Sequence, residues 1–208
     1  MLKVGVEDLC EVSGGVRALV AGQLTNLHVA AESVGQHRGG ARRSQRRRQR
    51  QFGHGHAGLV VVALEAEISV VGLRGPRTLP AGEFVTGPYL TALDHAELID
   101  AIVVPKRPKT ERWGHYKATR KIGEYAESMA IALVDKESNR ARLVLGAVDG
   151  PPLVLEESAI EITKGAKADK LSLVIQHELA ASDRGFSPSK LHLHRTVSLR
   201  AIQNAGLL

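Results

Sequence analysis

Two pairs of closely spaced histidines are the first residues in this 208-residue chain whose type and spacing could hold a metal ion. His54 and His56 flank a glycine in a glycine-rich stretch, and no third ligand is suggested nearby. His192 and His194 lie in a segment with helical spacing, where positions two apart differ by about 200° and their side chains diverge. Neither pair predicts a metal site.

The other reactive side chains do not form a catalytic set. Carboxylates are scattered, and the sequence contains no nucleophile elbow. Cys10 is the only cysteine, and one thiol makes neither an internal disulfide nor a zinc or iron–sulfur site. The longest apolar run, residues 59–64, is far shorter than the roughly 20 residues of a membrane helix. We expect no catalytic side chains, no metal, no membrane contact and a reducing, cytoplasmic location.

Positive charge is concentrated in one segment that holds no acidic residue. Its seven arginines are Arg38, Arg42, Arg43, Arg46, Arg47, Arg48 and Arg50. The other 21 Lys and Arg nearly balance 22 Asp and Glu, so the pI near 9.7 is a local property. Residues 37–58 offer little to bury, which predicts a mobile loop. Nucleic-acid or phosphate binding through residues 42–50 is a competing function, although only Phe52 could stack on bases.

A continuous series of turn and strand signals runs from residue 75 to residue 132. It begins GPRTLPAGEFVTGPYLTALDHAELIDAIVVPKRP and predicts a strand over residues 99–104 that stops at Pro105, which cannot donate to a sheet ladder. The loop before that strand carries Phe84, Gly87, Pro88 and Tyr89. The series ends ERWGHYKATRKIGEYAESMAIA, with a basic segment made of Lys117, Arg120 and Lys121.

This order of motifs resembles the flavin-binding medium subunit of the molybdenum hydroxylases, of the carbon monoxide dehydrogenase and xanthine dehydrogenase type. That family carries a similar run, G-x-R-T-x-P…F-F-x-G-P-Y-x-T-A-L…E-L-L…I-x-x-P, followed by Y-x-K-x-x-R-K-x-x-D-F-A. The resemblance covers roughly residue 60 to the C-terminus. It implies an oxidoreductase subunit that binds FAD and passes electrons from an iron–sulfur subunit to an external acceptor. Substrate would be oxidised in a third subunit that carries molybdopterin.

The resemblance also implies two cofactor-binding residues. Lys117 stands where the family places a lysine near the isoalloxazine ring, where a cation would stabilise negative charge on the reduced flavin; the alternative is a solvated lysine on a strand. Ile99 lies near the family's apolar flavin contact, and an ordinary core isoleucine is the alternative. Arg120 and Glu124 would form a structural ion pair.

The first lobe of the family pattern is incomplete in this chain. Two glycine-rich loops hold the flavin's pyrophosphate in the family, and neither has a clear counterpart here; the second falls where the Arg–Gln run stands. Out-of-frame reading of glycine codons in GC-rich DNA gives arginine-rich sequence, so we hypothesise a frameshift across residues 42–58. The chain would then be a subunit truncated on its N-terminal side and inactive alone. A cofactor-free remnant that still docks to its partners is a further alternative.

These patterns predict an α+β protein with three segments. Residues 1–58 would be degenerate or disordered, residues 59–108 a partial FAD-binding domain, and residues 109–208 a lobe in which a small antiparallel sheet packs on helices. Val16 and Leu19 have rough helical spacing. The other expected elements are a helix entering the apolar run at residue 59, a strand at 67–73, a strand pair at 129–134 and 141–148, and helices at 158–164, 169–181 and 187–205.

Overall fold

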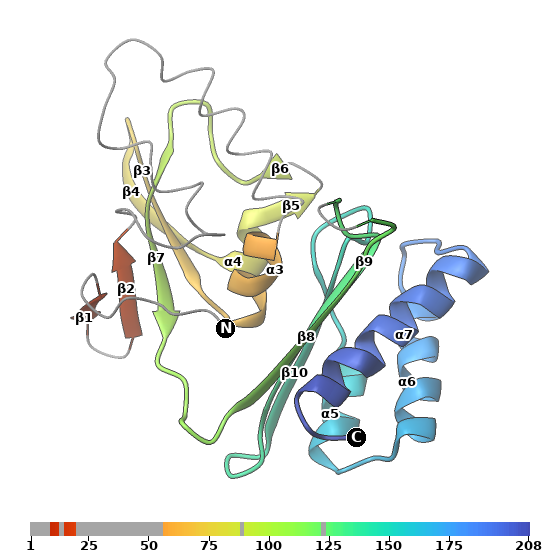
Figure 1. Ribbon diagram of the computed structural model, residues 1–208. Coiled ribbons are helices and arrows are strands. Elements are labelled where there is room, and N and C mark those ends of the chain that lie inside the picture. Colours follow the sequence, from red (N-terminus) through yellow and green to blue (C-terminus); the bar gives the residue numbers. More distant parts are fainter. Residues whose placement is uncertain (1–8, 13–14, 20–55, 88–89, 122–123) are drawn as a thin grey trace. The chain divides into compact units, whose positions relative to one another are not determined.

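The computed structural model describes residues 9–12, 15–19, 56–87, 90–121 and 124–208 (Figure 1). The chain divides into two units, Met1–Lys106 and Arg107–Leu208, and each is described here by itself. Both units combine helices with antiparallel sheets, which confirms the expected α+β class. Residues 20–55, which include the arginine run and His54, lie outside the described part.

The first unit is built on a five-stranded antiparallel sheet in the order β1-β2-β7-β3-β4 (Figure 1). Its strands are β1 (Leu9–Val12), β2 (Gly15–Leu19), β3 (Glu67–Gly72), β4 (Gly75–Pro80) and β7 (Leu98–Pro105). β7 lies at the centre and pairs with β2 on one side and β3 on the other. Gly75, with φ +99°, closes the short turn between β3 and β4, a conformation that glycine adopts without a Cβ clash.

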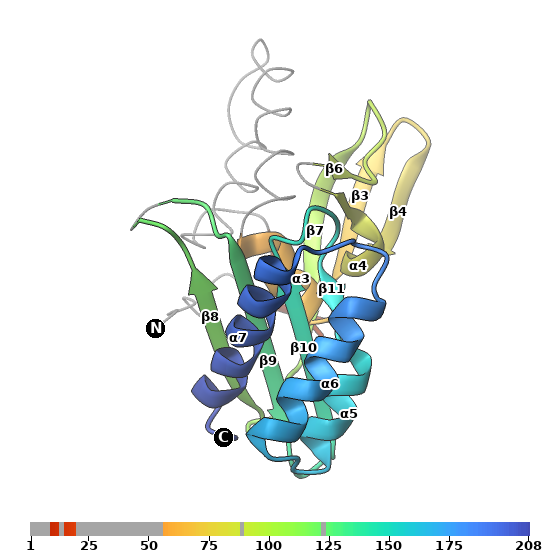
Figure 2. The same cartoon turned by 90° about the vertical axis from the view of Figure 1, so that its right-hand side faces the viewer.

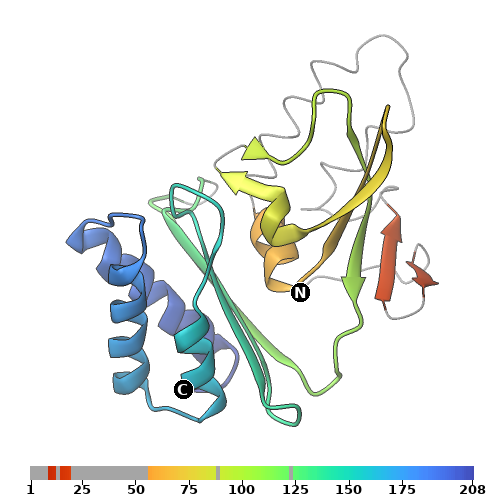
Figure 3. The same cartoon turned by 180° about the vertical axis from the view of Figure 1, so that it is seen from behind.

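Among its described residues, the first unit also contains two short helices and a two-stranded ribbon. The helices are α3 (His56–Ala63) and α4 (Ala81–Phe84), and the ribbon joins β5 (Val85–Gly87) to β6 (Leu90–Thr91). Since α3 is apolar almost all round, it buries Leu59, Val61 and Val62. Figure 3 shows α3 and α4 beside the strands.

The structure confirms most of the elements expected in the first unit. The helix at the apolar run, the strand near 67–73 and the strand that stops at Pro105 are all present. The helical interpretation of Val16 and Leu19 is wrong, because both lie in β2. Residues three positions apart lie on opposite faces of a strand, so their spacing does not predict one. Pairing with β7, more than 80 residues later in the chain, determines the strand.

The second unit is a four-stranded antiparallel sheet in the order β11-β10-β9-β8 with three helices on one face (Figures 1 and 2). The strands are β8 (Arg112–Ala118), β9 (Ser128–Asp135), β10 (Arg140–Gly146) and β11 (Leu153–Val154). The helices are α5 (Glu156–Thr163), α6 (Ala168–Ala181) and α7 (Pro188–Asn204). The strand pair, the three helices and the lobe itself match their expectations.

Alternate residues of β9 and β10 meet apolar helix faces to form the core of the second unit. The buried set comprises Ala130, Ala132, Val134, Leu143, Leu145, Val148, Leu155, Ile162, Leu171, Ile175, Leu179, Val197, Ala201 and Ile202. In α6, Leu171, Ile175 and Leu179 recur every four residues, which places them on the face that meets the core. Helix α7 begins with Ser187 as N-cap, whose hydroxyl accepts from the Lys190 N–H, and with Pro188 at its first position.

Strand β8 and helix α7 approach each other unusually closely. A Cβ at Gly114 would lie 2.1 Å from the Ala201 carbonyl oxygen and 2.4 Å from the Ala205 nitrogen. The Asn204 side-chain amide also donates to the His115 carbonyl at 2.8 Å. The absence of a side chain at position 114 therefore sets the distance between this edge strand and the helix. Among the described helices, none has both the length and the apolar character needed to cross a membrane.

Candidate functional site

Strand register places three side chains of the motif run in one row on the sheet of the first unit. Val70 in β3 is opposite Arg77 in β4 and opposite Ile99 in β7, and directly opposed residues share a face of a sheet. From the spacing between strands, Arg77 and Ile99 are about 10 Å apart. Ile99, the predicted flavin contact, is half-buried at the end of this row.

A β-bulge directs the Ile99 side chain to this face. The register passes from Ala101 opposite Ser69 to Ile99 opposite Val70, so Asp100 is an extra residue on β7. Because the bulge resets the alternation, Ile99 and Ile102 share a face although they are three positions apart. An unbroken ladder would have placed them on opposite faces.

A bidentate ion pair lies at the other end of the row. The Arg77 guanidinium donates from Nε and Nη2 to the two carboxylate oxygens of Glu97 at 2.8 and 2.7 Å. The same Nη2 donates to the Ala92 carbonyl at 2.7 Å, and Glu97 also accepts from the Asp94 N–H at 2.9 Å. The hydrogen bond from Arg77 is the main reason that the pKa of Glu97 falls to about 2, and the Asp94 N–H lowers it further.

This arrangement suits binding and positioning better than proton transfer. The carboxylate nearest to Ile99 in this network stays ionised at neutral pH, and the guanidinium beside it has a raised pKa. A row that has an apolar side chain at one end and a fixed, internally neutralised ion pair at the other can contact a flat, partly apolar ligand. Sequence reasoning missed Arg77 and Glu97 as a pair, although both stand in the motif run, because their separation of 20 positions hides the contact.

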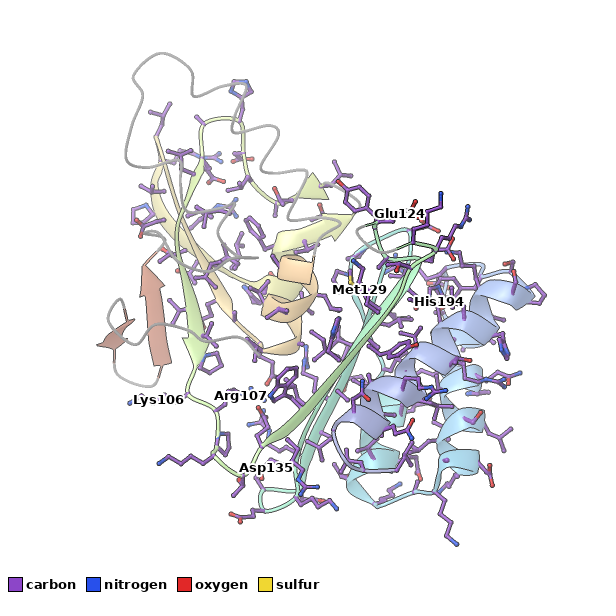
Figure 4. All side chains as sticks on the ribbon, in the orientation of Figure 1. Lys106, Arg107, Glu124, Met129, Asp135 and His194 are labelled. Atoms are coloured by element: carbon purple, nitrogen blue, oxygen red, sulfur yellow. The ribbon has the colours of Figure 1, made fainter. Side chains whose placement is uncertain are left out.

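Lys117 lies near the end of β8 in the second unit. Its Nζ donates to the Glu124 carbonyl at 3.0 Å, across the connection between β8 and β9. An ammonium has three donors, and among the described residues this is the one hydrogen bond that the Lys117 side chain makes. Figure 4 shows Glu124 at this end of the β8–β9 hairpin, together with Met129, the strand partner of Lys117.

The expected ion pair between Arg120 and Glu124 is not present. Arg120 instead pairs with Glu127, whose backbone carbonyl accepts from the Lys190 side chain of α7 at 3.2 Å. Glu127 donates its own N–H to the Ala118 carbonyl and so lies opposite the end of β8. The hydrogen bonds of Glu127 to Ala118 and to Lys190 of α7 hold it near Arg120, whereas the expectation for Glu124 rested on its place in the family pattern.

His192 and His194 diverge on α7 as their helical spacing predicts. His192 is exposed, whereas His194 is buried and its Nδ1 hydrogen-bonds to the Ser128 hydroxyl at 2.8 Å (Figure 4). The Phe186 ring packs edge-on against it with centroids 4.7 Å apart. Burial, with Lys190 second, lowers the pKa of His194 to about 4, so this imidazole is neutral at pH 7.

The predicted site residues belong to different units, Ile99 to the first and Lys117 to the second. His54 and the side chain of His56 lie outside the described part, as do the arginines of the run. Within the described residues, no group of three His, Cys, Asp or Glu side chains is arranged to hold a metal ion.

Comparison with known proteins assigns the segment that carries Arg77, Glu97 and Ile99. Residues 52–107 match the family described as the FAD binding domain in molybdopterin dehydrogenase. This segment is therefore similar to the FAD binding domain of molybdopterin dehydrogenases. The nicotine 6-hydroxylase medium subunit of Paenarthrobacter nicotinovorans is 31% identical over 95 residues, which is 44% of this chain and 33% of that protein.

A second medium subunit shows the same partial coverage. The carbon monoxide dehydrogenase medium chain of Hydrogenophaga pseudoflava is 33% identical over 90 residues, 41% of this chain and 31% of the relative. The chain thus spans about a third of the length of these medium subunits. In fold, it resembles the solved carbon monoxide dehydrogenase of Hydrogenophaga pseudoflava over 95% of this chain and 77% of that one, with a TM-score of 0.68 and 20% identity. Quinoline 2-oxidoreductase from Pseudomonas putida 86 gives the same TM-score and coverage at 18% identity.

Proposed function

We propose that this chain is an FAD-binding, electron-transferring subunit of a molybdenum hydroxylase-type oxidoreductase. The observation that carries the proposal is the match of residues 52–107 to the FAD-binding domain of molybdopterin dehydrogenases. In the proposed complex, an iron–sulfur subunit supplies electrons and a molybdopterin subunit oxidises the substrate. The cytoplasmic location and the three-segment division of the chain remain predictions.

Two described residues, one in each unit, offer contacts that suit the flat ring of a flavin. The row that ends at Ile99 offers an apolar contact, and the Lys117 ammonium has donors beyond the one it gives to Glu124. The described part contains no glycine-rich loop of the kind that holds a pyrophosphate. FAD, when bound, would supply the redox chemistry.

The chain's own residues would then bind and orient the ring. Ile99 would contact it through an apolar surface, held at its position by the bulge in β7. Lys117 would place a positive charge where reduction adds negative charge, which stabilises the reduced form more than the oxidised one. Neither residue transfers a proton in this proposal.

The visible absorption spectrum of the purified full chain, before and after addition of FAD and desalting, tests the function. Retained bands near roughly 370 and 450 nm, the usual range of a protein-held flavin, support the proposal. A chain that stays colourless refutes FAD binding by this chain and leaves the remnant that docks to its partners. Co-purification with an iron–sulfur and a molybdopterin subunit tests the partners separately.

Lys117→Gln probes the role of the cation within this experiment. We expect it to weaken binding of reduced FAD by about tenfold relative to oxidised FAD, because one charge interaction of about 1.4 kcal/mol is lost. Lys121→Gln is the matched control, since Lys121 is an exposed lysine four residues further along the chain. Equal effects of the two substitutions would show that Lys117 is a solvated surface lysine.

A further inference from the structure

The ion pair between Arg77 and Glu97 in the first unit is bidentate, and its carboxylate is buried. The Arg77 guanidinium also donates to a backbone carbonyl. The Glu97 side chain is 8% exposed and that of Arg77 is 37% exposed, so water reaches only one side of the pair. Such a fork-to-fork contact fixes both distance and orientation, which a single charge contact does not. The pair is therefore suited to hold one part of the chain in a defined place.

The pair pins the segment that leads into β7. The Ala92 carbonyl accepts from Arg77, while the Ala92 N–H donates to the Phe84 carbonyl at 2.9 Å. Asp94 and Glu97 close a tight turn in which the Asp94 N–H donates to the Glu97 carboxylate and the Glu97 N–H donates to the Asp94 carbonyl. Both backbone groups of Ala92 and the turn after it are therefore tied to the sheet or to α4.

Gly72 leaves the space that the Glu97 side chain occupies. A Cβ at position 72 would lie 2.7 Å from Glu97 Cγ and 3.3 Å from the Ala96 carbonyl oxygen. Gly72 is the last residue of β3, so the Glu97 side chain lies over the end of that strand. The Glu97 side chain thus packs against the backbone of β3 and hydrogen-bonds to the Arg77 guanidinium of β4.

We propose that Arg77 and Glu97 are positioning residues that fix residues 90–97 and, through them, the position of Ile99 as a contact for the flavin ring. Glu97 precedes Ile99 by two residues, and β7 begins between them at Leu98. A bulge is a locally weaker part of a ladder because it interrupts the regular register of the two strands. The ion pair stabilises the strand on the N-terminal side of that weak point. The consequence for FAD rests on the proposed function, whereas the pinning of residues 90–97 does not.

Two substitutions disturb the pair in different ways. Arg77→Lys keeps the charge and removes the fork, and Gly72→Ala keeps all charges and displaces Glu97. Arg74→Lys is the matched control, because Arg74 pairs with Asp94 in the same turn while both side chains are largely exposed, at 82% and 56%. Residue-resolved hydrogen exchange of the full chain is the first readout, and FAD binding by equilibrium dialysis is the second.

We expect Arg77→Lys and Gly72→Ala to speed exchange of the Ala92 and Asp94 amides by about tenfold, with β9 and β10 unchanged. We expect the dissociation constant for FAD to rise about tenfold in both variants, and the control to change neither readout. Unchanged exchange in both variants would overturn the positioning role. Faster exchange with unchanged FAD affinity would overturn the link to the flavin contact. Wild-type protein without FAD would overturn the proposed function alone, since exchange still decides whether the pair fixes the segment.

Discussion

Two polar pairs, Arg77–Glu97 in the first unit and Ser128–His194 in the second, join residues far apart in sequence and differ in their access to water. In the first unit, Arg77 and Glu97 carry full charges and Arg77 remains partly exposed. In the second, Ser128 and His194 are fully buried and their hydrogen bond joins neutral groups. Burial disfavours a charged imidazole, whereas an ion pair that keeps contact with water can stay ionised.

Each unit stabilises its buried polar group in a different way. The carboxylate of Glu97 is compensated by a guanidinium and a backbone N–H, so its pKa falls to about 2. The imidazole of His194 has the Ser128 hydroxyl on one nitrogen, while its Nε2 is buried and makes no hydrogen bond within the described part of the chain. The two pairs should therefore respond to acid in different pH ranges and to different substitutions.

The largest effect is expected when the close packing of α7, which carries His194, against the sheet is disturbed. Gly114→Ala puts a methyl group 2.1 Å from a backbone oxygen of α7, and a backbone cannot move aside as a side chain can. We expect a loss of about 3 kcal/mol in the free energy of unfolding. Urea unfolding followed by fluorescence of Trp113, the single tryptophan, measures it in the second unit.

Gly82→Ala in the first unit is the control for that substitution. A Cβ at Gly82 would meet nothing within 4 Å, and α4 tolerates alanine. We expect no loss of stability there. If Gly114→Ala proved as mild as Gly82→Ala, α7 would not depend on close contact with β8.

The next prediction is that acid lowers the stability of the second unit by protonating His194. Its pKa is about 4 in the folded protein against 6.5 when unfolded, so the unfolded chain binds the proton more readily. The contribution of His194 to stability is complete above pH 6.5 and falls by about 3 kcal/mol as the pH drops towards 4. Asp149, which favours the charged imidazole, moderates the effect.

Urea unfolding at pH 7.5 and pH 4.5, again followed by Trp113, measures this loss. His194→Gln keeps a side chain that can hydrogen-bond to Ser128 and removes the titration. We expect its stability to change less than that of the wild type between the two pH values. An equal change in both proteins would mean that other groups cause the acid sensitivity.

A smaller effect is expected at the N-terminus of α7. Ser187→Ala removes the hydroxyl that accepts from the Lys190 N–H and should cost about 1 kcal/mol. Ser187→Asp should keep the wild-type stability because aspartate is an equally good N-cap. The same urea experiment detects both, and a loss in Ser187→Asp as large as that in Ser187→Ala would indicate that the hydroxyl has another role.

Acid titration of Glu97 tests the pair in the first unit through a local readout. Its folded pKa of about 2 lies below the ordinary value of 4.5, so its contribution is complete above pH 4.5 and is lost as the pH falls towards 2. Carboxyl carbon NMR should give a midpoint near pH 2 in the wild type. Arg77→Gln should move that midpoint towards 4.5, and an unmoved midpoint would show that backbone donors hold the pKa instead.

The sequence predicted the second unit better than the first because its signals are local. The helix at 187–205 starts with Ser-Pro, and the β9–β10 hairpin has a polar turn between two apolar runs, so neighbouring residues specify each element. Strand β2 was misread because only pairing with β7 distinguishes it from a helix. Arg120 was given the wrong partner because Glu127 is held in place by Lys190 of α7, which the local sequence cannot indicate.

The sequence by itself determined the α+β class, the likeness to flavin-binding medium subunits, and the strand and helix periods. Those properties depend on residue type and spacing within a few turns of chain. Only the tertiary structure decided that Arg77 meets Glu97, that a bulge directs Ile99 to the same face, and that Gly114 lets α7 approach β8. Each of these depends on strand register or helix packing, which brings together residues 20 to about 90 positions apart and leaves no periodic trace in the sequence.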